Sequence, residues 1–328
     1  MEFHCENGLT KDIVFVDGPT KAAKRMFHPV ITGFEGVEVV TMDPLFERLA
    51  LLYHYNKMDK DVAISLLRNQ LQEHVFYTVI GRKTNFNFHD YSGIFYNIGT
   101  LKNIKRIFRK DKDVLKAIKE EKPLIQVQTH DTLPHIDILF EAFGEGLKMI
   151  ESLRDPIALV NSMYLHGYGK REGSDPMKIM MTVKHKEEYL PWYCIGWEDR
   201  YLELSQMDRV IHFVNTRSKN IFEKYEKLTD EQKKQILFIP FEDIIINFDH
   251  YIPKIEKFLG RKVEKSFDKI RKKIKLSTKE DLEKERKKKL ATIKELASEE
   301  YYELLIKMGQ EYDETVSRLL SIQNNLTK

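Results

Sequence analysis

The chain has 328 residues, 42% of them apolar, enough to bury the core of a large single-domain protein. Gly and Pro number only 15 and 10, which excludes a collagen-like or low-complexity chain. Basic and acidic residues nearly balance, leaving a formal net charge of +3, so nothing in the charge requires a nucleic acid partner. The balance is compatible with an anionic small-molecule ligand.

The two cysteines, Cys5 and Cys194, show no spacing typical of a disulfide framework, which favours a reducing compartment. Residues 1–12 are polar and lack the basic and apolar regions of a signal peptide. No apolar run approaches the roughly 20 residues needed to span a bilayer. These features predict a cytoplasmic protein without a transmembrane segment, and leave the oligomeric state open.

Short apolar, β-branched runs alternate with longer amphipathic stretches, a pattern typical of βαβ units. It predicts an α/β fold with a parallel β-sheet flanked by helices. The expected strands are Ile13–Asp17, Val37–Met42, Leu124–Thr129, Lys148–Leu153, Arg209–Asn215 and Ile236–Phe241. The expected helices are Leu45–Tyr55, Val62–Glu73, Leu101–Glu121 and Pro156–Leu165.

The C-terminal part has helical periodicity alone, at Glu280–Leu296 and Glu299–Gln323. Residues 261–294 are strongly basic, and the densest point is residues 286–289. This stretch is either a solvated helix face or a segment that closes over a polyanionic cofactor. We predict one domain over residues 1–328, with a core at about 11–261 and a helical extension at 262–328.

A tight turn, residues 17–25, separates the first expected strand from a helical segment, and free N–H groups at such a corner bind anions. Gly18 and Lys24 have the separation of the Walker A pattern. However, Ala23 replaces its second Gly, and Arg25 replaces the Ser/Thr that holds Mg²⁺. This disfavours a magnesium-dependent NTPase, and a plain strand-to-helix turn remains an alternative.

A second corner follows the strand that ends near Arg154, where Pro156 opens a helix that carries Ser162. A guanidinium and a hydroxyl are suited to bind one phosphate group. The alternative is that Asp155 caps the helix while Arg154 forms a surface ion pair. A third strand end places His130 after Thr129, where imidazole can act as a base at neutral pH or serve only in structure.

In their order along the chain, these segments resemble the sulfotransferases that use 3′-phosphoadenylyl sulfate (PAPS). The family's 5′-phosphosulfate loop reads Pro, Lys or Arg, Ser, Gly, Thr, Thr or Ser. Lys21 matches its basic residue, Ala22 and Ala23 stand for Ser-Gly, and Lys24 and Arg25 stand for the hydroxyl residues.

The resemblance implies roles for residues beyond this loop. Arg154 and Ser162 match the Arg and Ser that bind the 3′-phosphate, and His130 matches the general base. Gln128 stands where the family has Lys. Residues 236–260 resemble its strand and helix closing in Phe-Leu-Gly, whereas its C-terminal Arg-Lys-Gly loop is not recognisable, and Arg286 or its Lys neighbours are the candidates to replace it.

The resemblance thus implies a P-loop-type fold and an enzyme that moves a sulfuryl group from PAPS to an acceptor hydroxyl, without a metal. Gly18, Lys21, Ala22, Ala23, Lys24 and Arg25 would bind the cofactor, and Lys21 would stabilise the leaving phosphate. The polar, aromatic loop 81–92 suggests a carbohydrate acceptor bound by Asn85, Asn87 and Asp90, with an ordinary surface loop as the alternative.

Two other functions remain open. A P-loop kinase or other NTPase needs a Ser/Thr after Lys24, where Arg25 stands. A non-catalytic descendant that binds nucleotide or a partner protein is suggested by Ala22 and Ala23 in the loop. Such a descendant would bind the cofactor without turnover.

Overall fold

The computed structural model describes residues 1–170 and 180–326. Within them the chain forms two compact units: residues 1–153, 224–276 and 322–326 make the first, and residues 154–170, 180–223 and 277–321 the second. The helices α9 (Gln206–Lys227) and α15 (Glu299–Leu326) have residues in both. The expectation of a single domain stays a prediction.

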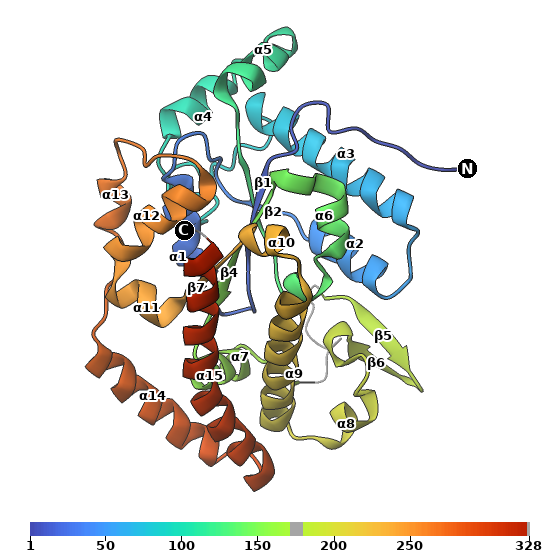
Figure 1. Ribbon diagram of the computed structural model, residues 1–328, viewed down its shortest axis with the longest axis vertical. Coiled ribbons are helices and arrows are strands. Elements are labelled where there is room, and N and C mark those ends of the chain that lie inside the picture. Colours follow the sequence, from blue (N-terminus) through green and yellow to red (C-terminus); the bar gives the residue numbers. More distant parts are fainter. Residues whose placement is uncertain (171–179, 327–328) are drawn as a thin grey trace. The chain divides into compact units, whose positions relative to one another are not determined.

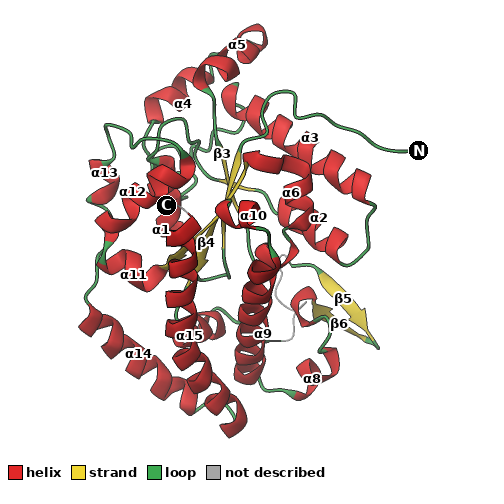
Figure 2. Cartoon of the chain, viewed as in Figure 1, coloured by secondary structure: helices red, strands yellow, loops and turns green. Residues whose placement is uncertain are grey.

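The first unit is built on a five-stranded parallel sheet in the order β2-β3-β1-β4-β7. Figure 2 colours the strands yellow and the helices red. Its central strand, β1, is buried along its whole length, as expected for a parallel strand covered on both faces. The strands are β1 (Ile13–Asp17), β2 (Thr41–Met42), β3 (Ile125–Gln128), β4 (Leu147–Leu153) and β7 (Ile236–Pro240).

Helices cover both faces of this sheet, which confirms the predicted α/β class (Figure 1). One set packs together on one side: α1 (Lys24–Thr32), α11 (Phe241–Ile246), α12 (Phe248–Leu259) and α13 (Asp268–Arg271). The other set packs around the longest of them, α3: α2 (Leu45–His54), α3 (Lys60–Val79), α5 (Asp111–Glu121) and α6 (Asp137–Phe143). Shorter elements complete the unit: α4 (Thr100–Arg106), α10 (Asp230–Lys234), η1 (Leu133–His135) and η2 (Gly144–Gly146).

The second unit has its own apolar core, in which α7 packs against α14. Tyr193 and Tyr201 belong to this core, and Trp197 packs against it. Its elements are α7 (Pro156–Leu165), the antiparallel pair β5 (Thr182–His185) and β6 (Glu188–Pro191), η3 (Trp192–Cys194), α8 (Glu198–Glu203) and α14 (Lys279–Lys294).

Three expected elements differ in the structure. The expected strand Arg209–Asn215 is wrong, because these residues lie inside α9, where Met207, Val210 and Val214 are buried with helical spacing. Within the expected strand Val37–Met42 only Thr41 and Met42 pair with β3. The expected helix Leu101–Glu121 is two helices, α4 and α5, separated by residues 107–110.

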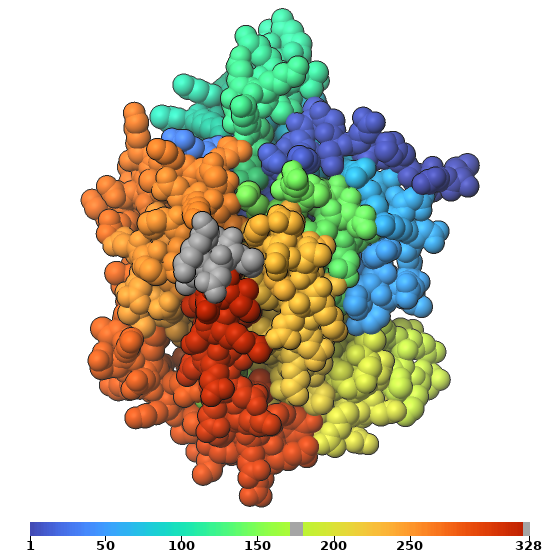
Figure 3. Space-filling model, in the orientation of Figure 1, coloured from blue at the N-terminus to red at the C-terminus, as the bar shows by residue number. Residues whose placement is uncertain are grey.

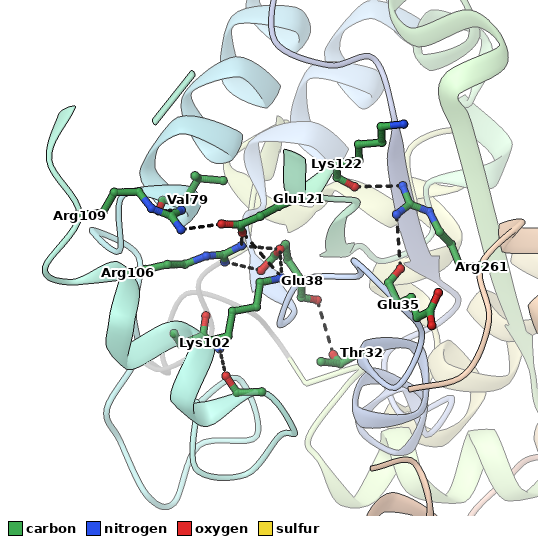
Figure 4. Close-up of polar contacts among 12 residues, drawn as sticks. Thr32, Glu35, Glu38, Val79, Lys102, Arg106, Arg109, Glu121, Lys122 and Arg261 are labelled. Carbon is green, nitrogen blue, oxygen red and sulfur yellow. Dashed lines mark hydrogen bonds and ion pairs between the residues drawn. The ribbon is translucent and has the colours of Figure 1, made fainter. Parts of the chain in front are cut away.

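A buried ion network holds Arg106, the last residue of α4 (Figure 4). The Arg106 guanidinium, 1% exposed, donates to both oxygens of Glu38 at 2.6 and 2.9 Å and also contacts Glu121. Arg109, just beyond α4, donates to the Val79 carbonyl and to Glu121. Burial acts to raise the pKa of Glu38, but Arg106 outweighs it and holds this pKa below its ordinary value. The network therefore fixes both helices to the segment that leads into β2.

The segment that carries α4 and α5 stands at the surface of the first unit (Figure 3). Leu101 and Phe108 are 75% and 77% exposed, in contrast to Arg106 between them. The buried charge, rather than an apolar stripe, therefore anchors α4.

Replacing Arg106 with Leu should lower the free energy of unfolding by about 3–5 kcal/mol, because the buried Glu38 carboxylate loses both Arg106 hydrogen bonds and keeps, among the described residues, only its ion pair with Lys102. Adding Glu38→Leu should recover part of this loss. Urea denaturation followed by circular dichroism measures both. Lys116→Ala, at a lysine whose side chain is 78% exposed, is the control, and an equal effect of this variant would contradict the assignment.

Candidate functional site

The carboxyl ends of three neighbouring strands form the candidate site of the first unit. The chain passes from β1 to β2, on the β3 side of the sheet, and from β3 to β4, on the other side of β1, so the connections after these neighbouring strands run in opposite directions. Ligands of open parallel sheets bind at such reversals of strand order. Gly18 follows β1, and His130 comes two residues after β3.

The loop between β1 and α1 passes very close to β4. Gly18 has φ +129°, and a Cβ at this position would lie 2.7 Å from the Ser152 carbonyl oxygen. The Ser152 hydroxyl donates to the Ala22 carbonyl at 2.6 Å. A glycine is required here both by the backbone angle and by the approach of β4.

The basic residues of this loop lie in different environments. Lys21 is exposed at the tip of the loop with φ 73°. Lys24, 5% exposed, turns inward: its ammonium donates to the Pro19 carbonyl at 3.0 Å and to the Gly18 carbonyl. Arg25 is exposed, and its guanidinium lies 4.9 Å from the centre of the Tyr91 ring. Lys24 thus braces the loop from within, whereas Lys21 and Arg25 face its surroundings.

Ala22 and Ala23 form the turn that enters α1. Ala22 is buried, and its N–H donates to the Pro19 carbonyl at 3.0 Å. Ala23 has φ 62° and directly precedes α1. Neither residue offers a side-chain hydroxyl, so this turn has only backbone groups to present to an anion.

Two buried carboxyl groups lie beneath the loop. Asp17 and Glu151 are both fully buried and are register partners in β1 and β4. Burial, followed by the charge of Asp17, raises the pKa of Glu151 well above its ordinary value, and Lys24 opposes this shift. We therefore expect Glu151 to hold its proton near neutral pH.

His130 lies in a polar cluster that joins α2 and β3. Its Nδ1 is 3.2 Å from Oε2 of Glu47, and its backbone N–H donates to the same oxygen at 2.7 Å. Its Nε2 is 3.2 Å from Nε2 of Gln128. Burial, with the charge of Lys24, lowers the pKa of His130, while Glu47 acts in the opposite direction. The side chain is still 31% exposed, so the ring is neutral near pH 7 and partly open.

The predicted acceptor-binding residues make hydrogen bonds within their own loop. Asn85 donates to Asp90 at 3.1 Å and to Ser92 at 2.8 Å. The Asn87 side chain accepts from the His89 N–H at 2.9 Å. These bonds shape the loop, and a role in substrate binding stays a prediction. From the same loop, the Tyr91 hydroxyl reaches Gln128 at 3.0 Å.

The second unit holds the Arg154–Ser162 corner. Asp155 caps α7, because its side chain accepts from the Ala158 N–H at 2.8 Å. Its other oxygen accepts from Nε of Arg286, on α14, at 3.0 Å. Arg154 and Ser162 are both partly exposed. The capping role considered for Asp155 is thus confirmed, and its ion pair with Arg286 brings that residue of α14 beside the start of α7.

Several residues of the site carried no clear sequence signal. Glu47 looked like an ordinary acidic residue in the first turn of a helix, and Tyr91 lay in an aperiodic loop. His28, on α1, is fully buried and contacts Gln128. Only the strand end at His130 indicated where they would meet.

The family model described as "Sulfotransferase domain" matches residues 27–309. This span is most of the chain, so the protein belongs to the sulfotransferase family, whose defining reaction is the transfer of sulfuryl groups. A comparison with curated proteins finds no match.

Solved sulfotransferase structures are also similar to this chain. The domain from the curacin biosynthetic pathway has 10% identity over 78% of this chain and 76% of its own, with a TM-score of 0.41. The domain from the Synechococcus PCC 7002 olefin synthase has 11% identity over 81% of this chain and 80% of its own, with a TM-score of 0.40. The sulfotransferase STF1 from Mycobacterium tuberculosis H37Rv has 11% identity over 84% of this chain and 76% of its own, with a TM-score of 0.39. The family assignment rests on the family model alone.

Three further findings concern residues 1–170 and 180–326. No helix there is both long and apolar enough to cross a membrane. That part of the chain also contains no group of three or more His, Cys, Asp or Glu able to hold a metal ion. Neither Cys5 nor Cys194 forms a disulfide bond there.

Replacing Glu151 with Gln should stabilise the protein increasingly as pH rises. In the unfolded wild type this carboxyl loses its proton above its ordinary pKa of about 4.5, whereas in the folded state it keeps the proton. The wild type therefore loses stability across that range, and the amide does not. Thermal unfolding of the wild type and Glu151→Gln from pH 4 to pH 8 measures the difference in their stability. A difference that does not increase with pH would contradict the raised pKa of Glu151.

Proposed function

We propose that this protein transfers a sulfuryl group from PAPS to a hydroxyl group of an acceptor. The observation that carries the proposal is that Lys21 and His130 follow two neighbouring parallel strands, β1 and β3, on a chain of the sulfotransferase family. An exposed cation and a neutral imidazole follow neighbouring strands there.

In this proposal the β1–α1 loop binds the 5′-phosphosulfate end of the cofactor. The backbone N–H groups at the start of α1 and the side chains of Lys21 and Arg25 supply positive potential. Lys24 holds the loop in shape through the Gly18 and Pro19 carbonyls. As the bridging S–O bond breaks, Lys21 stabilises the charge that develops on the departing phosphate oxygen.

His130 takes the proton of the acceptor hydroxyl as the new S–O bond forms. Glu47 accepts from Nδ1, so Nε2 is the nitrogen that receives this proton. Glu47 also stabilises the imidazolium that results. The lowered pKa of His130 keeps the ring unprotonated before the reaction at neutral pH.

Arg154 and Ser162 are proposed to hold the 3′-phosphate of the cofactor. The guanidinium supplies paired charge-assisted hydrogen bonds, and the hydroxyl adds one more. Arg286 is the proposed replacement for the missing Arg-Lys-Gly loop, since its ion pair with Asp155 brings it to the start of α7.

A carbohydrate is the acceptor class that we propose. Phe88 and Phe95 stack at 4.3 Å with an interplanar angle of 8°, and Phe88 is 69% exposed. Such a flat apolar surface is of the kind that packs against a sugar ring, beside the polar groups of Asn85, Asn87 and Asp90.

Truncating Arg154 to Ala should weaken the binding of adenosine 3′,5′-bisphosphate by about 2–5 kcal/mol, the usual loss on removing one member of a desolvated charge pair. Isothermal titration calorimetry measures this change. Arg200→Ala, at an arginine paired with Glu300, is the matched control and should bind like the wild type. No binding by the wild type would contradict the proposed function.

Lys21→Ala should lower kcat by about 10²–10³-fold, because the developing charge loses its stabilising cation. Binding of adenosine 3′,5′-bisphosphate should fall much less. Lys60→Ala, which removes an exposed lysine of the same unit, should leave kcat unchanged. Cofactor binding without turnover in the wild type would instead indicate a non-catalytic descendant.

A further inference from the structure

A continuous row of hydrogen-bonded side chains runs from the interior of the first unit to His130. Nε2 of Gln126 is 3.2 Å from Nδ1 of His28, and Nε2 of His28 is 2.5 Å from Oε1 of Gln128. Nε2 of Gln128 then reaches Nε2 of His130, and Nδ1 of His130 reaches Glu47. Amide and imidazole groups alternate along this row.

Both ends of the row fix its direction. Nε2 of Gln126 also lies 3.4 Å from the backbone carbonyl of His28, which only accepts, so the Gln126 NH₂ group is the donor at this end. At the other end the Glu47 carboxylate accepts from Nδ1–H of His130. Each group between them then has a single consistent assignment, in which every contact joins one donor to one acceptor.

Gln128 occupies the decisive position. Its oxygen accepts from Nε2–H of His28 and from the Tyr91 hydroxyl, and reversing the amide would place its NH₂ group against the His28 N–H. Its NH₂ group must therefore face His130. An NH₂ group here can donate a hydrogen bond to Nε2 of His130 when that nitrogen has a lone pair, and it is repelled when that nitrogen carries a proton.

We propose that Gln128, held by His28 and Gln126, is a positioning residue that keeps His130 neutral, with the proton on Nδ1 and the lone pair on Nε2. The catalytic meaning of this assignment rests on the proposed function, in which Nε2 receives the acceptor proton. The acceptor hydroxyl then takes the place of the Gln128 amide at Nε2. The proposal also accounts for a glutamine where the family has Lys.

The row is buried at the Gln126 end and partly exposed at the His130 end. Gln126 and His28 are fully buried and Gln128 is 7% exposed, whereas the His130 side chain is 31% exposed. Burial also lowers the pKa of His28 to about 3, so this ring stays neutral and keeps one donor and one acceptor. A mismatch at any inner position would leave a polar group without a partner away from water.

Other charged groups near His130 do not replace Gln128 in this role. Glu47 and Asp17 favour the protonated ring, and Lys24 opposes it from α1. Lys24 acts through its charge alone and selects neither ring nitrogen. Of the side chains described around His130, Gln128 is the one for which a hydrogen-bond contact with Nε2 is found.

The direct test is ¹⁵N NMR of the histidine side chains in the free wild-type protein, with His130 assigned by the loss of its signals in His130→Gln. At neutral pH we expect the Nδ1 shift of a protonated nitrogen and the Nε2 shift of an unprotonated one. A proton on Nε2 would overturn the inference. This readout needs no turnover, so it stays separate from failure of the proposed function, which would appear as absent cofactor binding.

Substitutions of Gln128 test whether this residue controls the protonation of His130. In Gln128→Glu the carboxylate accepts from both histidines, so the titration midpoint of His130 should rise by about 1–3 pH units, the usual effect of a nearby opposite charge. Gln128→Leu, which removes the NH₂ donor without adding a charge, should raise the midpoint less and serves if the first variant does not fold.

Tyr91→Phe is the matched control, because it removes a partner of Gln128 while His28 still holds the amide. The titration midpoint of His130 in Tyr91→Phe should match that of the wild type. An unchanged midpoint in Gln128→Glu, or an equal rise in Tyr91→Phe, would overturn the inference.

Discussion

The Asp17 carboxylate is the contact on which the candidate site of the first unit depends. It ends β1, directly before Gly18, and its Oδ2 accepts from the N–H groups of Thr132 and Leu133 at 2.8 and 3.0 Å. These two residues follow His130, so one buried side chain joins the segment carrying the proposed base to the start of the proposed phosphate loop. Glu151 beside it keeps its proton, which avoids two adjacent buried charges.

Much of the fold could be predicted from the sequence, because the buried strands leave a pattern with few alternatives. The predicted bounds of β1 and α7 agree with the structure, and Gly260 ends α12 in the left-handed conformation, as its Phe-Leu-Gly motif implied. In these places the local signal and the packing agree. The α/β class followed from the same alternation.

The sequence failed where tertiary contacts outweigh local preference. Residues 209–215 are rich in β-branched residues, yet the apolar spacing of the longer segment makes them helical. The hairpin of β5 and β6 turns at Lys186, with φ 53°, without the Gly or Asn that usually marks such a turn. The position of Arg106 in a buried network could not be read from a helix that otherwise looks amphipathic.

For the site, the sequence indicated the residues at strand ends but not their partners. His130 was predicted from its position after a strand. Its partner Glu47, and the partners of Gln128, His28 and Tyr91, come from segments far away in the sequence. Their roles depend on donor and acceptor directions, which only a folded arrangement defines. Gln128 stands where the family has Lys, and the role proposed for it is that of a neutral donor to His130.

The most direct test of the account is the transfer of ³⁵S from labelled PAPS to a panel of glycans and simple alcohols, comparing the wild type with His130→Gln. We expect labelled product from at least one hydroxyl acceptor with the wild type, and a loss of at least about 100-fold in the variant. Transfer at the wild-type rate by His130→Gln, or no labelled product with any acceptor, would contradict it.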